Sequence, residues 1–98
     1  MLVGAFRSQN YPNPFNPKTT ITFDVPGELG DERQVRLTIY DVRGRKVKAL
    51  VDSELEPGSH RVVWDGRNDS GQRVTSGVYL YTLRSEAKTY TRKMVMVK

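Results

Sequence analysis

Apolar and polar residues alternate with a period of two along most of the chain, the pattern of strands that turn one face toward a core. The clearest run is 19–25, where Ile21, Phe23 and Val25 share one side and polar residues occupy the other. The remaining strand-like runs are 35–41, 46–51, 60–64, 73–76, 78–84 and 89–97. The pattern therefore predicts about seven strands.

The stretch 60–83 is the part around which the other runs can be placed. It contains the chain's one tryptophan, Trp64, and a polar turn at 65–71 that is rich in Gly, Asn, Asp and Ser. Such residues tolerate positive φ or hydrogen-bond their own backbone. Two strands flanking a turn indicate either a β-hairpin or a crossing from one sheet to another, and both interpretations remain open.

The fold class follows from the strands and from the turn residues between them. No run has the length and period of a four-turn helix, and turn residues recur at intervals of roughly eight to twelve positions. We predict an all-β fold, an antiparallel Ig-like β-sandwich of about seven strands. Its expected structural core is Ile21, Phe23, Leu37, Ile39, Val62, Trp64, Tyr79, Tyr81 and Leu83.

The amino-terminal part is rich in asparagine and proline, which excludes helix and favours an extended path. We predict that 1–18 is an extended entry segment and that 19–98 is the sandwich. Phe15 is costly to expose, so we expect it to pack against the sandwich and to fix the entry of the first strand. A ligand for a proline-recognising domain is a weaker interpretation, because such motifs need no asparagines.

Composition limits the partners and the chemistry. The chain has 98 residues, which suffices for one small domain, and it contains no cysteine, so it forms no disulfide and no Cys-based zinc site. Sixteen Lys and Arg against eleven Asp and Glu give a net charge of +5. Only four of these cations cluster, Arg43, Arg45, Lys46 and Lys48, so the charge is that of solvated strand faces and we expect no nucleic-acid partner.

The first residues bear on export. Residues 1–6 are apolar but too few for the core of a signal peptide or for a membrane span. We therefore expect no membrane insertion. If the protein acts outside the cytoplasm, we expect the chain to be a piece of a longer precursor.

Two features suggest catalysis or metal binding, and each has a simpler explanation. His60 has the parity of Trp64 and is expected to be a strand residue, and no local pattern combines a nucleophile, a base and an orienting group. The turn at 65–71 resembles a calcium loop, but Arg67 occupies the third position, where a carboxylate or amide is needed. We predict no enzyme activity, no cofactor and no metal site.

The aromatic residues Trp64, Tyr79 and Tyr81 would suit a sugar-stacking platform. Their strand parity is that of core residues, so carbohydrate binding by an accessory module is only an alternative function. Exposure of these rings would favour it, and their burial would remove it.

The last strand-like run is unusual because Met94, Val95, Met96 and Val97 are apolar at consecutive positions, between Lys93 and Lys98. A strand with this composition either has both faces covered or keeps one face for a partner.

Several segments together resemble the C-terminal sorting domain of type IX secretion cargo, and the same pattern is shared with the Ig-like domain of the flagellar hook-capping protein. The segments are YPNPFNP at 11–17, the strand at 19–26, IYD at 39–41 with GR at 44–45, GSH at 58–60, WDG at 64–66, SGVY at 76–79 and KMVMVK at 93–98. The resemblance covers the chain from about Tyr11 onward.

The resemblance implies a non-catalytic sorting or anchoring module of a secreted bacterial protein, exported to the periplasm and on to the cell surface. The expected partners are the outer-membrane translocon with its sorting and cleavage machinery, and a second copy through the C-terminal edge strand. The sorting signal would be Lys93, Met94, Val95, Met96, Val97 and Lys98. Because the sorting domain is expected to be C-terminal, a chain that ends at Lys98 favours the sorting domain over the hook-capping domain. The alternative is a structural Ig-like module of a cell-surface or flagellar hook-capping assembly.

Overall fold

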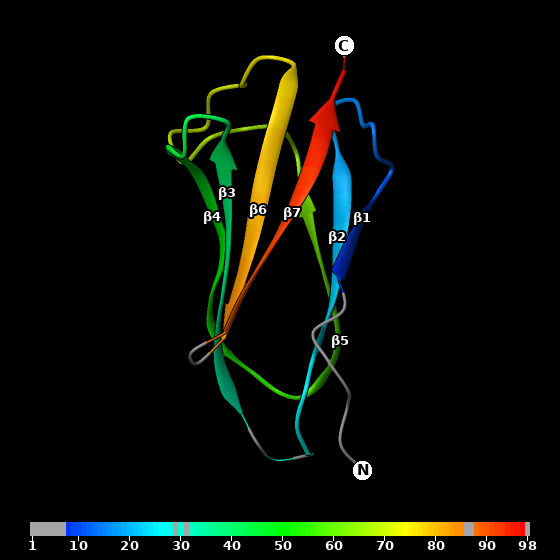
Figure 1. Cartoon of the computed structure of the whole chain (residues 1–98), viewed down its shortest axis with the longest axis vertical. Coiled ribbons are helices and arrows are strands. Elements are labelled where there is room, and N and C mark those ends of the chain that lie inside the picture. The colour runs from blue at the N-terminus through cyan, green and yellow to red at the C-terminus, as the bar shows by residue number, and fades with distance from the viewer. Residues whose placement is uncertain (1–7, 29, 31, 86–87, 98) are drawn as a thin grey trace.

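Seven strands make up the secondary structure of the part of the chain that the computed structural model describes, residues 8–28, 30, 32–85 and 88–97 (Figure 1). The strands are β1 (Ser8–Tyr11), β2 (Thr19–Val25), β3 (Arg33–Asp41), β4 (Lys46–Leu55), β5 (Gly58–Trp64), β6 (Gly77–Ser85) and β7 (Lys88–Met96). Within these residues no helix could cross a membrane.

The strands form two antiparallel sheets that enclose the core between them. One sheet has the order β1-β2-β5, and the other has the order β4-β3-β6-β7. In β2 every second residue is buried, so one face meets the opposite sheet and the other faces solvent. This confirms the predicted all-β, antiparallel Ig-like sandwich.

Aromatic rings fill one end of the core. The ring of Trp64 lies 5.6 Å from that of Phe15 and 5.3 Å from that of Tyr79, the latter at 70°, an edge-to-face arrangement. Of the core residues expected from sequence, all are buried except Val62, which is half-buried and packs against the cluster. Phe15 is buried with them, as expected from the cost of exposing its ring to solvent.

The stretch 60–83 is a crossing between sheets. Its first strand, β5, belongs to the three-stranded sheet, and its second strand, β6, belongs to the four-stranded sheet. The loop between them is tied to the core because the Trp64 indole Nε1 donates to the Arg67 carbonyl at 2.9 Å. Gly66 has φ +79°, and a Cβ there would lie 3.1 Å from the Pro17 carbonyl oxygen, so the loop requires glycine at this position.

The predicted strand at 73–76 is wrong. Only Arg73 makes a bridge, to Arg67 across the loop, and the Val74 N–H donates to the Gly66 carbonyl at 3.0 Å. Val74 packs against the core, which accounts for the apolar position in the pattern without any strand. The loop turns back on itself here instead of extending along a sheet.

The structure nevertheless has seven strands, because it contains an edge strand, β1, that the pattern did not predict. Its four residues, SQNY, are polar, and it pairs with β2 at the edge of the three-stranded sheet, with Gln9 opposite Thr22. An edge strand is held by backbone hydrogen bonds and needs no hydrophobic alternation. The boundary between an entry segment 1–18 and a sandwich 19–98 remains a prediction, and residues 1–7 lie outside the described part.

Candidate functional site

The terminal strand β7 is docked along its whole length on β6, at the edge of the four-stranded sheet. Met94 and Met96 point into the core and are buried, whereas Val95 is half-buried and Val97 is 43% exposed. One face of the all-apolar run is thus covered by the core. The other face remains open to solvent. The strand therefore does not have both faces covered, which was the first of the two interpretations of the pattern.

The outer edge of β7 is covered at its carboxyl end by a segment that we call the N-terminal latch, residues 13–15. The Phe15 N–H donates to the Val95 carbonyl at 2.9 Å, and the Val97 N–H donates to the Phe15 carbonyl at 2.8 Å. The Val95 N–H donates to the Asn13 Oδ1 atom at 3.0 Å. In Figure 1 the loop after β1 passes beside the arrowhead of β7.

The rest of this edge carries no neighbouring strand in the described part of the chain. Since Val95 and Val97 direct their backbone groups outward, the alternation of an antiparallel strand directs those of Lys93, Thr91 and Thr89 outward as well. This open segment can accept an added strand through backbone hydrogen bonds. Of the expected signal, Lys93 lies on this open segment, residues 94–97 lie beside the latch, and Lys98 falls outside the described residues.

The alternative of a sugar-stacking platform is excluded, because its three aromatic residues are core residues, as their strand parity predicted. Trp64, Tyr79 and Tyr81 are all buried between the sheets, and the Tyr79 hydroxyl donates to the Thr75 carbonyl at 2.6 Å. No face of these rings is available to a sugar, because each is covered by the core. This removes the carbohydrate-binding alternative.

The turn at 65–71 uses its oxygen atoms for its own backbone and for neighbouring cations. The Asn68 Oδ1 atom accepts from the N–H groups of Ser70 and Gln72, each at 3.0 Å. The Asp69 carboxylate lies 3.7 Å from the Lys46 ammonium and 3.9 Å from the Lys48 ammonium. Among the described residues, no three His, Cys, Asp or Glu side chains gather in a group suited to a metal ion.

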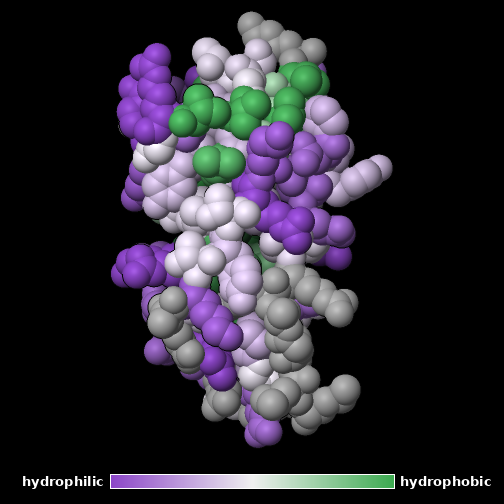
Figure 2. Space-filling view, in the orientation of Figure 1, coloured by the Kyte–Doolittle hydropathy of each residue, from purple (hydrophilic) through white to green (hydrophobic). Residues whose placement is uncertain are grey.

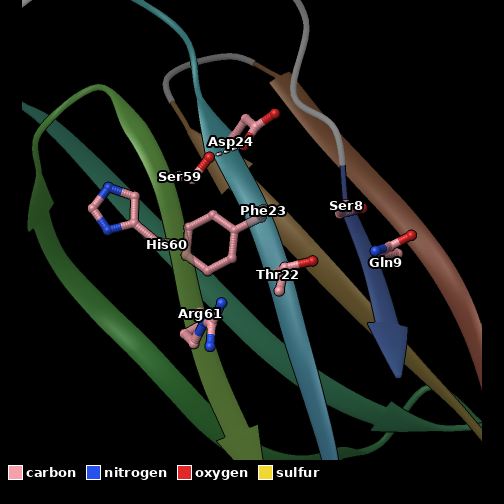
Figure 3. Close-up of a pocket in the computed structure, with 8 residues that line it drawn as sticks. All are labelled: Ser8, Gln9, Thr22, Phe23, Asp24, Ser59, His60 and Arg61. Atoms are coloured by element: carbon pink, nitrogen blue, oxygen red, sulfur yellow. Dashed lines mark hydrogen bonds between the residues drawn. The ribbon is translucent and has the colours of Figure 1, made fainter. Parts of the chain in front are cut away.

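A shallow depression on the three-stranded sheet includes a serine, a histidine and an aspartate among its lining residues (Figure 3). Ser59 Oγ donates to Asp24 Oδ1 at 2.7 Å, while the His60 ring stacks on Phe23 at 5.6 Å and donates from Nε2 to the Glu56 carbonyl at 2.7 Å. Ser59 and His60 are consecutive on a strand, so their side chains point to opposite faces. The serine therefore lacks the imidazole partner that nucleophilic catalysis requires.

The hairpin between β3 and β4 is organised by one carboxylate. Asp41 Oδ1 accepts from the N–H groups of Arg43 and Arg45 at 2.9 and 3.0 Å, and its Oδ2 accepts from the Arg45 guanidinium at 3.0 Å. Gly44, with φ +82°, completes the turn. The hydrogen bond from the Arg45 backbone is the largest cause that lowers the pKa of Asp41 below its usual 3.8.

Because the pKa of Asp41 is lowered in the folded chain, its carboxylate contributes stability above pH 3.8, and this contribution is lost as the pH falls through the folded-state value. We expect Asp41→Asn to lower the free energy of unfolding at neutral pH and to flatten its decline below pH 3.8. Urea unfolding of both proteins at a series of pH values measures this difference. Parallel pH profiles for the two proteins would contradict the assigned role of Asp41.

Comparison with known proteins places this architecture in a family. The sequence profile of the FlgD Ig-like domain matches residues 15–89. The basal-body rod modification protein FlgD of Salmonella typhimurium (strain LT2) and that of Salmonella typhi are each 41% identical over 46 residues, 47% of this chain and 20% of theirs. The chain thus spans about a fifth of the length of the curated relatives it matches.

Two solved structures share the fold. Dimeric latent PorU of Porphyromonas gingivalis aligns with a TM-score of 0.71 and 24% identity, over 97% of this chain and 10% of that one, a likeness of fold alone. PorZ, an essential bacterial surface component of the type-IX secretion system of the same organism, aligns with a TM-score of 0.62 and 25% identity, over 93% of this chain and 11% of that one. On the match over residues 15–89, the chain belongs to the FlgD Ig-like domain family.

Proposed function

We propose that the chain is a non-catalytic module that sorts a secreted bacterial protein to the cell surface and anchors it there, through recognition by the outer-membrane type IX secretion machinery. The observation that carries this proposal is the terminal strand. It is held by the core through Met94 and Met96, yet it presents Lys93, Val95 and Val97 on an outer face. Its backbone edge is also open from Thr89 to Lys93. A folded domain can thus display a linear signal.

The similarity to known proteins also supports this proposal. PorZ, with the same fold, is a surface component of the type-IX secretion system, and the family to which the chain belongs is structural, not enzymatic. We infer an exported location, first the periplasm and then the cell surface, as part of a larger precursor. The proposed partner is the outer-membrane translocon with its sorting and cleavage machinery.

The test is a fusion of the full chain behind an exported reporter in a type IX-competent bacterium. Removal of residues 93–98 would also remove two core methionines, so a deletion confounds signal with folding. The sharper variant is the double substitution Lys93→Ser and Val97→Ser, which changes exposed side chains only. We expect surface delivery of this variant to fall about tenfold, the factor that corresponds to ~1.4 kcal/mol of lost recognition.

The matched control is Arg61→Ser with Val63→Ser, an exposed cation and an exposed valine on β5 in the opposite sheet. We expect the control fusion to reach the surface as the parent does. Resistance of the retained variant to periplasmic protease would show that it is folded. Equal delivery of both double variants would exclude these two side chains as the signal.

A structural module of a flagellar assembly is the second candidate. It is favoured by the 41% identity to FlgD over 46 residues and by the way in which β7 completes the core. In such a module the last strand serves only to complete the fold and is not recognised by a partner. It therefore predicts no loss of any function when Lys93 and Val97 are changed, and no surface delivery of the parent fusion.

A further inference from the structure

The outer face of the four-stranded sheet carries an exposed apolar surface at the end where β6 begins and β7 ends. Figure 2 shows apolar side chains gathered there, with hydrophilic side chains on both sides of them. We call this surface the aliphatic patch. Its residues, contributed by β6, β7 and the hairpin after β3, are Val42, Val78, Leu80, Val95 and Val97.

Strand register brings the members from β6 and β7 together. Val78 lies directly opposite Val95, and Leu80 lies one alternate position further along the same face of β6. Val97 extends the row beyond the end of β7. Alternate residues of these strands, such as the core methionines, face inward, so this row faces solvent.

Val42 joins the patch from the hairpin turn that follows β3. The register of β3 with β6 ends with Asp41 opposite Tyr79, so Val42 comes next to Val78, and the two valines line one shallow depression. Val42 is 68% exposed and Val78 is 37% exposed. Single exposed valines are common on protein surfaces, but a contiguous group from two strands and a neighbouring hairpin turn is typical of an interaction site.

The border of the patch is cationic. Arg43 follows Val42 and is exposed, and Lys93, also exposed, lies opposite Leu80. The nearby carboxylate, that of Asp41, is engaged by the backbone of its own turn and by Arg45. A complementary surface would therefore present aliphatic side chains flanked by Asp or Glu.

The same observations disfavour two other occupants. A membrane surface is usually bound by clusters of about four to eight basic residues and by interfacial Trp or Phe, whereas this patch is aliphatic with two bordering cations. A second copy of the chain would place the same cationic border against itself, in a protein whose net charge is already +5. The geometry and charge favour a protein partner of opposite charge.

We propose that the aliphatic patch is the docking surface for an acidic-bordered, aliphatic segment of the recognition partner, so that Val42 and Val78 act with the terminal strand. This inference rests on the proposed sorting function and extends it to residues far from 93–98 in sequence. The partner contacts a face assembled from β6, β7 and the hairpin turn after β3, and only the folded domain presents that face.

The experiment uses the same reporter fusion with Val42→Thr and Val78→Thr combined, which keeps side-chain shape and β-branching while adding hydroxyls. We expect surface delivery to fall about tenfold, the equivalent of ~1.4 kcal/mol shared between two contacts. Arg43→Glu is expected to reduce delivery, and Arg43→Lys is expected to retain it. Val63→Thr, at a valine 53% exposed on the opposite sheet, is the matched control, and urea unfolding verifies that each variant folds.

The outcomes separate this inference from the function on which it rests. If the valine double variant is delivered like the parent while the Lys93 and Val97 variant is retained, Val42 and Val78 take no part in docking. The extension of the recognition surface beyond the terminal strand then fails, and the sorting function stands. If the parent fusion is never delivered, both proposals fail.

Two measurements on the purified chain test the other occupants. Vesicles of equal parts phosphatidylglycerol and phosphatidylcholine should not bind the chain, and the valine double variant should sediment in the same oligomeric state as the parent chain. Binding or self-association that the valine double variant abolishes would assign the patch to lipid or to a second copy, and would overturn the proposal.

Discussion

Replacement of Trp64 by alanine is expected to lower the free energy of unfolding by about 3–5 kcal/mol, a large part of the stability of a small domain. The indole is fully buried, and its ring packs against Phe15 and Tyr79. Its Nε1 also closes the crossing loop through the Arg67 carbonyl. The substitution therefore opens a cavity and releases the link between the two sheets.

Urea unfolding followed by circular dichroism measures this loss, since the variant has no tryptophan for fluorescence. Val63→Ala is the control, because Val63 is the neighbour of Trp64 on the exposed face and its truncation is expected to cost about 0.5 kcal/mol or less. Trp64→Phe should fall between the two. A cost below about 1 kcal/mol for Trp64→Ala would mean that the aromatic cluster does not hold the sheets together.

Replacement of Phe15 by alanine is expected to cost about 3–5 kcal/mol and to expose the carboxyl end of β7. The Phe15 side chain anchors the N-terminal latch in the core, and its backbone holds Val95 and Val97 by two hydrogen bonds. Without the anchor, the latch loses the packing that keeps it on the edge. Amide hydrogen exchange at Val97 should then rise more than exchange in the centre of β6.

The control for the latch is Tyr11→Ala, a change to a 77% exposed aromatic ring in the same part of the chain. We expect this control to leave both stability and Val97 exchange near the parent values. If Phe15→Ala accelerates exchange uniformly in β3, β6 and β7, the latch is an ordinary core contact with no separate hold on the terminal strand.

The terminal strand shows what a local sequence pattern can predict and what depends on strand register. Four consecutive apolar residues at 94–97 already indicated that this strand differs from the others. Which two of them face the core depends on register with β6, where Met94 lies opposite Tyr79 and Met96 opposite Gly77. A shift of one residue would exchange the two faces, and only packing against the opposite sheet selects one of them.

The fold class and the alternating strands, such as 19–25, could be predicted from the amino-acid sequence, because strand geometry imposes a period of two at each position. The edge strand β1, the latch on β7 and the proximity of Val42 to Val78 became apparent only in the folded structure. Backbone hydrogen bonds at an edge require no particular side chains. Residues far apart in the sequence come together because of the register between paired strands. That register is selected by the packing of both sheets and cannot be predicted from any single segment.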